Sequence, residues 1–381
     1  MKRYPLLDVC ARIGGHPAQH ELLRIRSCAF SDWNNLLERT EKEGMAPLLK
    51  KHLEESGSTY PDSVRRSLNI LAKRHQEQAR IRMEVLQEAL QLFHCNGLTP
   101  MPIKGAALCC TLYPHPGLRP MRDMDILFRP SEVGHGQEIL LDAGFVQSNA
   151  PIPLDHFHLP SLHKVVDGVK ICIELHRGLY PNCPPWYPEV DFEQLLKTGR
   201  KIRLGDIDTV TLNDEETLHY LYQHAFRSPL TYEPYRLINV ADIIGFTERN
   251  WQALDWQQIR GRFPVLLTAL PLMHHISPWD FEKIPKGFVP EKERKRRLEP
   301  VPFDGWPRRR LKVLQTEGRT LWQVLLDTFL PSIWWLGVYY GSVTVGGCLW
   351  CFVWRHPQHV YWWKKLFSEI AVLGRSKPVV D

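Results

Sequence analysis

Two aspartates one residue apart are the first sign of chemistry in this sequence. Asp123 and Asp125 flank Met124 in a run that alternates polar and apolar residues before it turns apolar, which predicts a β-strand. Successive side chains of a strand point to opposite faces, so both carboxylates share one side. Two carboxylates on one face repel each other unless a cation binds between them. Mg²⁺ or Mn²⁺, hard divalent ions with oxygen ligands, fit this position.

A third acidic residue follows in a later apolar run. Within residues 169–176, isoleucine and leucine occupy every second position from 171 to 175, whereas Glu174 and His176 share the opposite face with a cysteine. A buried carboxylate needs a partner. If this strand lies beside residues 123–128, three carboxylates converge. Three carboxylates can hold two metal ions about 3.5–4 Å apart, the arrangement used for phosphoryl transfer.

Basic residues that precede the acidic pair are placed to hold phosphates. Lys104 and Gly105 stand where a predicted short strand, residues 98–103, runs into a helix. Glycine lets the backbone approach a phosphate, and a helix N-terminus favours anions. Lys104 adds a point charge, and Arg119 and Arg122, just before the acidic pair, either contact a triphosphate or form surface ion pairs. His176 either contacts phosphate, orients the third carboxylate, or is a structural histidine at a strand end.

Helical and strand patterns surround these residues. Apolar residues recur at helical spacing over 68–93, after the candidate N-caps Asp62 and Ser63 and before a C-cap signal at 96–97. This predicts one long amphipathic helix whose apolar stripe covers the segment that follows it.

The segment after residue 99 predicts a small α/β unit. Residues 137–143 indicate a helix, and the runs 159–166 and 169–176 indicate two strands. Asp167 and Gly168 join these strands, and this pair predicts a hairpin because both central residues of a type I′ turn need positive φ.

Together, these motifs resemble those of the uncharacterised bacterial nucleotidyltransferase family of the DNA polymerase β-like superfamily, over about residues 30–275. The segments that carry the resemblance are Lys104-Gly105-Ala106-Ala107-Leu108, Tyr113-Pro114, Arg119, Asp123-Met124-Asp125-Ile126-Leu127 and Glu174-Leu175-His176. The resemblance implies that Asp123, Asp125 and Glu174 bind the metals and that Glu174 helps to activate an acceptor hydroxyl. It also implies an NTP substrate such as ATP.

Three features depart from the wider superfamily. Lys104-Gly105 stands where Gly-Ser is usual, and the seventeen residues between Gly105 and Asp123 exceed the usual spacing. The third carboxylate is Glu174 rather than the commoner aspartate, which adds a methylene to the side chain that would act as base.

The fold class predicted is α+β, with a minimal nucleotidyltransferase α/β core (a small mixed sheet with helices) flanked by helical regions. Four parts are predicted: a helical N-terminal region (1–98), the catalytic core (99–212), a helical substrate-side domain (213–280), and a basic, proline-rich loop with an apolar aromatic C-terminal tail (281–381). The second helical part begins at Asn213, three residues before Glu216, as in a capping box.

Composition limits the class of protein. Of 381 residues, 44% are hydrophobic and 24% charged, which excludes a disordered chain, a collagen-like repeat and a multi-span membrane protein. Nine cysteines and the lack of an apolar signal segment after Met1 favour a reducing, cytoplasmic location. The net charge of +6 matches the surplus within residues 281–319, where twelve Lys/Arg face six Asp/Glu.

The C-terminal tail raises the question of membrane contact. Residues 328–354 carry no charge, a length that could cross a bilayer. Pro331, several glycines and many Trp and Tyr residues favour packed or interfacial helices instead. The tail therefore predicts either oligomer contacts or peripheral contact with the inner membrane surface.

The function predicted is transfer of a nucleoside monophosphate from an NTP to an acceptor hydroxyl, with two-metal catalysis and release of pyrophosphate. The acceptor stays open: a small molecule, a glycan, a protein or an RNA end is compatible. The alternative is a nucleotide-binding or scaffold module with little turnover that acts at a membrane surface.

Overall fold

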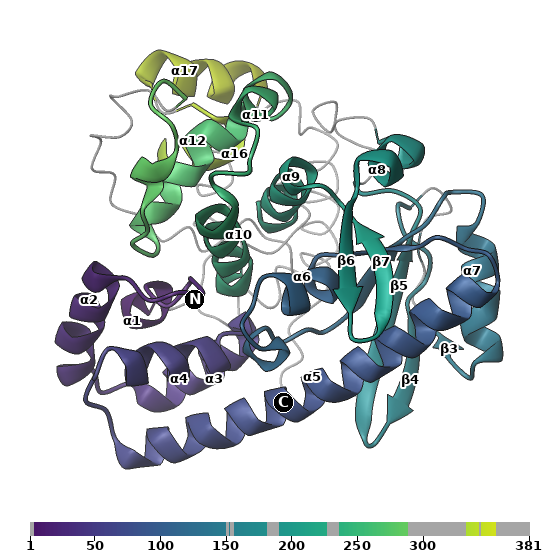
Figure 1. The fold of residues 1–381 in the computed structure, drawn as a ribbon. Helices are drawn as coiled ribbons and strands as arrows, with labels where there is room; N and C mark the ends of the chain where they lie inside the picture. The colour runs from purple at the N-terminus through teal and green to yellow at the C-terminus, as the bar shows by residue number, and fades with distance from the viewer. Residues whose placement is uncertain are drawn as a thin grey trace, which may run out of the picture.

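A computed structural model describes residues 4–149, 152, 156–180, 190–226, 236–288, 333–342 and 344–355. Within these residues the protein has the predicted α+β class, with a five-stranded mixed sheet, a separate hairpin and surrounding helices (Figure 1). The helices are α1 (Pro5–Asp8), α2 (Pro17–Cys28), α3 (Trp33–Glu43), α4 (Ala46–Glu55), α5 (Asp62–Cys95), α6 (Gly105–Thr111), α7 (Val133–Asp142), α8 (Phe192–Thr198), α9 (Asp214–Ala225), α10 (Leu237–Asn250), α11 (Trp256–Arg262), α12 (Val265–Leu272), α16 (Ile333–Tyr340) and α17 (Val345–Trp350). The strands are β1 (Met101–Ile103), β2 (Met124–Leu127), β3 (Val146–Gln147), β4 (Leu162–Val166), β5 (Val169–His176), β6 (Arg200–Leu204) and β7 (Ile207–Thr211).

The main sheet has the strand order β1-β2-β5-β4-β3. Strands β2 and β5 are parallel neighbours, and the other adjacent pairs are antiparallel. The predicted hairpin is confirmed, because β4 and β5 are joined by Asp167 and Gly168 with φ values of 49° and 74°. Strand β2 thus lies beside the second strand of the hairpin, as the acidic pattern requires.

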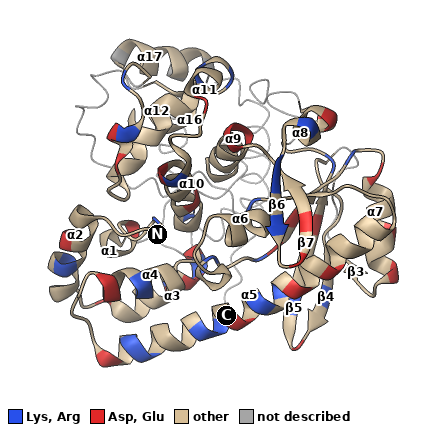
Figure 2. Ribbon diagram, in the orientation of Figure 1, with Lys and Arg blue, Asp and Glu red and all other residues tan. Residues whose placement is uncertain are grey.

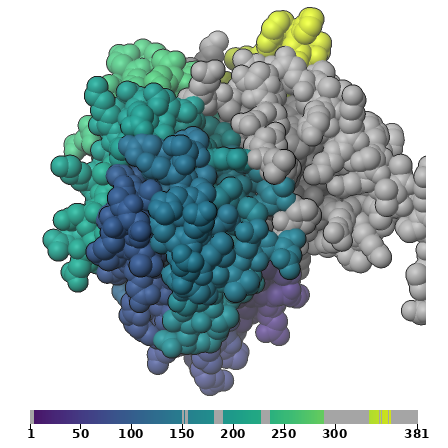
Figure 3. Space-filling model, turned by 90° about the vertical axis from the view of Figure 1, so that its right-hand side faces the viewer, coloured from purple at the N-terminus to yellow at the C-terminus, as the bar shows by residue number. Residues whose placement is uncertain are grey.

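The long helix α5 covers one face of the sheet. Ile126 and Phe128 from β2 and its end, and Ile173 from β5, belong to one buried cluster with Leu90 and Phe93 of α5. Figure 3 views the molecule from the right-hand side of Figure 1, and there segments with different colours, and so from distant parts of the sequence, pack against one another. This apolar packing leaves the opposite face of β2 and β5 to the polar side chains.

The predicted long helix is confirmed in extent, but not in its cap. Helix α5 runs from Asp62 to Cys95, and Pro61 is the N-cap, without a side-chain cap bond. On its outer face, Arg80 forms ion pairs with Glu77 and Glu84 one turn to either side. Figure 2 shows this alternation of basic and acidic residues along α5. The buried apolar stripe holds this helix against the sheet, and the paired charges keep its other face in contact with water.

The helices before α5 and those after residue 213 share a second buried cluster. It joins Leu23 and Leu49 from the N-terminal helices to Ile243 and Leu270 from α10 and α12, and to Trp334 from α16. Helix α9 begins as predicted, because the Asn213 side chain accepts a hydrogen bond from the Glu216 N–H. The division into four parts stays a prediction.

Several elements were not predicted from the sequence. They are the short edge strand β3, the helix α8 and the hairpin β6–β7, whose Thr211 hydroxyl donates to the carbonyl of Pro102 in β1. Most of the basic, proline-rich loop, from residue 289 onwards, and most of the C-terminal tail lie outside the described residues. Among the helices that are described, none has the length and apolar character needed to cross a membrane.

Candidate active site

The parallel register of β2 and β5 brings acidic residues from two strands together. Asp125 lies directly opposite Glu174 in this register. His176, two residues further along β5, places its Nε2 2.8 Å from Asp125 Oδ1 and 3.8 Å from Glu174 Oε2. Ligand atoms of these three residues all lie within 4.8 Å of one another. Since these side chains leave the sheet on the face away from α5, they form a compact polar cluster on that face.

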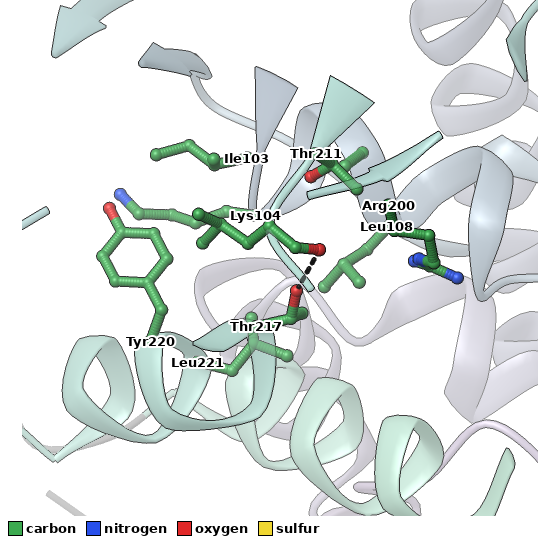
Figure 4. Close-up of a pocket in the computed structure, with 10 residues that line it drawn as sticks. Ile103, Lys104, Leu108, Arg200, Thr211, Thr217, Tyr220 and Leu221 are labelled. Carbon is green, nitrogen blue, oxygen red and sulfur yellow. Dashed lines mark hydrogen bonds between the residues drawn. The ribbon is translucent and has the colours of Figure 1, made fainter. Parts of the chain in front are cut away.

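Lys104 joins this cluster from the turn between β1 and α6. Its Nζ donates to Asp125 Oδ1 at 2.8 Å and lies 5.6 Å from the centre of the Tyr220 ring (Figure 4). The backbone of Lys104 has a φ of 48°, which is uncommon for a residue with a side chain and marks a constrained position. The cavity beside it, lined by Ile103 and Thr211 among others, has a volume of about 10 Å³. Since this is room for about one water molecule, this cavity is too small for a nucleotide.

Gly105 permits a close approach at the start of α6. A Cβ atom at this position would overlap the Arg119 guanidinium and lie 2.9 Å from Met121 Sδ. The glycine therefore lets the segment that leads into β2 pack directly on the first turn of α6. Its expected role in phosphate binding stays a prediction.

The two aspartates have opposite electrostatic environments. Burial alone would raise the pKa of Asp125, but Lys104 and His176 outweigh it and hold this pKa well below its usual range. Burial and the charge of Asp125 instead raise the pKa of Asp123. Burial also lowers the pKa of His176, so the imidazole is held towards its neutral form. Asp125 is thus the stably ionised carboxylate, whereas the negative charge of Asp125 disfavours ionisation of Asp123.

Asp123 stands at the edge of the cluster. It precedes β2 and is half-buried, and it interacts electrostatically with Asp125, Lys104 and His176. It does not belong to the described group of potential ligands within 4.8 Å. The structure therefore brings Asp125, Glu174 and His176 into direct proximity and places Asp123 close by.

The two arginines expected to reach a triphosphate have other partners. Arg119 is buried and donates from Nε and Nη2 to the two oxygens of Asp242, at 2.9 and 2.6 Å. Tyr113 donates to the same carboxylate at 2.7 Å. Arg122 is exposed and donates to the carbonyl of Lys42. Arg119 therefore holds the segment before β2 against α10, and its positive charge still acts on Asp123.

Two other arginines near Asp123 were missed in the sequence. Arg82 on α5 and Arg236 at the N-cap of α10 each interact electrostatically with Asp123, and burial lowers both of their pKa values. The Nε atoms of both are buried, with no hydrogen-bond partner among the described residues. A signal was present for Arg82, which interrupts the apolar stripe of α5 between the buried Ile81 and Met83. No comparable signal marked Arg236.

A second histidine lies beside His176. His158 forms an antiparallel bridge with His176, and the ring centres are 5.3 Å apart. Burial lowers the pKa of His158 to about 4. His156 in turn places its Nε2 2.9 Å from that of His158. These rings form one wall beside the acidic cluster.

The donor set at this site fits a hard divalent cation. Asp125 and Glu174 supply carboxylate oxygens, Asp123 adds negative charge nearby, and His176 supplies an imidazole nitrogen. Magnesium and manganese prefer such oxygen-rich sites, whereas thiolate-binding metals would need the cysteines that this group lacks among the described residues. Lys104 already neutralises part of the charge of Asp125.

One comparison with known proteins identifies a family. A model of the family described as uncharacterised nucleotidyltransferase matches residues 30–266, which include every residue of the cluster. Because this match covers more than half of the chain, the protein belongs to that nucleotidyltransferase family, as the sequence motifs predicted. Searches of the curated proteins and of the solved structures found no match.

Proposed function

We propose that this protein transfers a nucleoside monophosphate from an NTP to an acceptor hydroxyl. The acceptor oxygen attacks the α-phosphorus, the bond from this phosphorus to the bridging oxygen of the β-phosphate breaks, and pyrophosphate leaves. The observation that supports this function best is the register of β2 and β5, which sets Asp125 opposite Glu174 with His176 beside both. Membership of the nucleotidyltransferase family supports the same reaction class.

Asp123, Asp125 and Glu174 are the residues that would hold Mg²⁺ or Mn²⁺. When bound, such ions neutralise charge on the phosphates and on the attacking and leaving oxygens. Asp125 suits this role because its low pKa keeps it ionised. Asp123 suits it because an added cation would relieve its repulsion by Asp125.

Glu174 is the proposed acceptor of the hydroxyl proton. Its side chain is partly exposed, whereas those of Asp125 and His176 are buried, so Glu174 is the member of the cluster that an acceptor can reach. His176 lies within 3.8 Å of it and is held by Asp125, which suits a positioning role. Positioning and charge neutralisation would supply most of the rate enhancement.

Arg82 and Arg236 are the proposed triphosphate ligands, together with Lys104. Both guanidinium groups lie near Asp123 and retain a buried Nε without a partner among the described residues. A phosphate oxygen is the acceptor that a guanidinium binds best. Arg119 contributes less directly, because Asp242 already takes two of its donors.

The test is metal-dependent release of pyrophosphate by the purified full-length protein. Each of the four NTPs, labelled at the α-phosphate, is incubated with Mg²⁺ or Mn²⁺ and pools of small molecules, glycans, proteins and RNA. We expect labelled product and pyrophosphate in equal amounts, and a loss of about a hundredfold or more in Asp125→Asn. Asp206→Asn, which changes a fully exposed aspartate, is the matched control and should retain activity.

The alternative function is nucleotide binding with little turnover. The observation that favours it is the 2.8 Å contact of Lys104 with Asp125, because the protein supplies its own cation to the central carboxylate. This alternative includes contact with a membrane surface, and the exposed apolar side chains of Leu349, Trp350 and Trp354 support such contact. Metal-independent NTP binding without pyrophosphate release from any acceptor pool would favour this module over the transferase.

A further inference from the structure

A second group of metal-ligating side chains lies far from the sheet. His20 on α2 and His52 and Glu55 on α4 each offer one ligand atom, and these atoms all lie within 4.8 Å of one another. Helices α2 and α4 stand at the end of the molecule opposite the sheet (Figure 1). From this geometry we propose that His20, His52 and Glu55 form a zinc site, separate from the proposed nucleotidyl-transfer site.

His52 is held in the form that a metal ligand requires. Its ring is fully buried, and Nε2 lies 2.8 Å from the backbone carbonyl oxygen of Arg12. A carbonyl only accepts hydrogen bonds, so Nε2 carries the proton and Nδ1 carries the lone pair. This Nδ1 is buried and has no hydrogen-bond partner among the described residues. Metal-bound histidines characteristically donate their second ring N–H to such a carbonyl, which fixes the ring and its tautomer.

His20 places a second ring nitrogen near His52 and Glu55. Its Nε2 is buried and also lacks a hydrogen-bond partner in the part of the chain that is described. Gly15 lies against it: a Cβ at Gly15 would be 2.8 Å from His20 Nε2 and 3.7 Å from Glu55 Oε2. The missing side chain of Gly15 therefore leaves space between two of the three ligand atoms.

Glu55 supplies the negative charge. Its Oε2 lies 3.9 Å from His52 Nδ1, and its side chain is 43% exposed, so it can move. Lys51 donates to the same oxygen at 2.7 Å, which places one cation beside the group already. Binding of a metal would exchange this exposed pair for a bond to a divalent ion.

Two imidazoles and one carboxylate are a donor set typical of zinc sites with an open fourth position for water. Metal–nitrogen distances of about 2.0–2.1 Å would set the ligand atoms of a tetrahedral site roughly 3.3 Å apart. The observed group needs only a small contraction to reach this spacing, and Glu55 has the freedom to make it. Magnesium is the poorer match because it prefers oxygen ligands.

The experiment compares zinc binding by the full-length protein and two variants after removal of metals with a chelator. His20→Gln removes one ligand that is only partly buried. Gly15→Ala keeps all three ligands and fills the space beside them. His135→Gln is the control, because His135 is an exposed histidine of α7 that pairs only with Glu138 in the described structure.

Zinc stoichiometry and affinity are measured by calorimetry, and Co²⁺ is titrated in parallel to record the visible absorption of a tetrahedral site. We expect the wild type and His135→Gln to bind one zinc ion more than His20→Gln. Gly15→Ala should bind at this site about tenfold more weakly or worse. Equal stoichiometry and affinity in the wild type and His20→Gln, with both folded by circular dichroism, would overturn the proposal. Equal loss in His135→Gln would also overturn it.

Discussion

Asp125 and Asp242 are both buried aspartates with cationic partners, but their carboxylates are used differently. Arg119 forms a bidentate pair with the two carboxylate oxygens of Asp242, and Tyr113 donates a further hydrogen bond. At Asp125, the ammonium of Lys104 and the ring of His176 meet on a single oxygen, Oδ1. Two equally buried carboxylates therefore differ in how many of their oxygens a cation holds.

The difference follows from the geometry of the two cations. The planar guanidinium of Arg119 matches both oxygens of a carboxylate and locks the pair in one orientation. Lys104 is a point charge on a flexible stem, so its contact is easier to exchange for another cation. Asp242 thus ties α10 to the segment before β2, whereas Asp125 keeps a charge that a metal can share.

The largest expected effect is on the structural pair. Asp242→Asn should lower the free energy of unfolding by about 3–5 kcal/mol, because it leaves the buried charge of Arg119 without its partner. Urea denaturation measures this loss. Asp280→Asn, which removes a half-exposed partner of His16 and Lys283, is the control and should change stability by less than about 1 kcal/mol. Similar losses in both variants would show that Asp242 is not a structural anchor.

A smaller loss of stability is expected at Asp125. Asp125→Asn should lower the free energy of unfolding by about 1–3 kcal/mol in the presence of a chelator, because Lys104 and His176 lose a charged acceptor. Nucleotidyl transfer should be lost while the protein stays folded. If this variant is destabilised more than Asp242→Asn, the comparison is reversed and Asp125 is the structural residue.

The smallest effect, with the opposite sign, is expected at Asp123. Asp123→Asn removes the carboxylate that Asp125 repels, so the metal-free protein at pH 7 should be unchanged or stabilised by up to about 1 kcal/mol. Its proposed transferase activity should nevertheless be lost. The melting temperature in a chelator measures the first effect, and pyrophosphate release measures the second. A clear loss of stability would mean that Asp123 has a favourable partner in the fold.

Charge repulsion within the pair, the interaction that the sequence makes visible, predicts that Asp125→Asn leaves stability unchanged or higher. The contacts in the structure lead to a different prediction for Asp125, a loss of stability, and apply the repulsion argument to Asp123 instead. The reason is that Lys104 and His176 each form a hydrogen bond with Asp125 Oδ1, at 2.8 Å. Their positions depend on β1, α6 and β5, whose arrangement no local pattern encodes.

Local patterns in the sequence did determine much of this protein. The apolar spacing of residues 68–93 was enough to predict the long helix α5. The Asp167-Gly168 pair was enough to predict the turn between β4 and β5. Alternation along β2 and β5 also determined which side chains share a face. These features follow from the 3.6-residue and two-residue periods of the backbone and from the φ values that a turn requires.

Only the tertiary structure decided which of these faces and charges meet. His176 and Asp125 are 51 residues apart, and Arg119 and Asp242 are 123 apart. Such pairs form when apolar faces pack and strands choose neighbours, and the free energy that selects them is spread over the whole core rather than over any short segment. The same reason explains why Arg82, Arg236 and the group around His52 were recognised only in the folded chain.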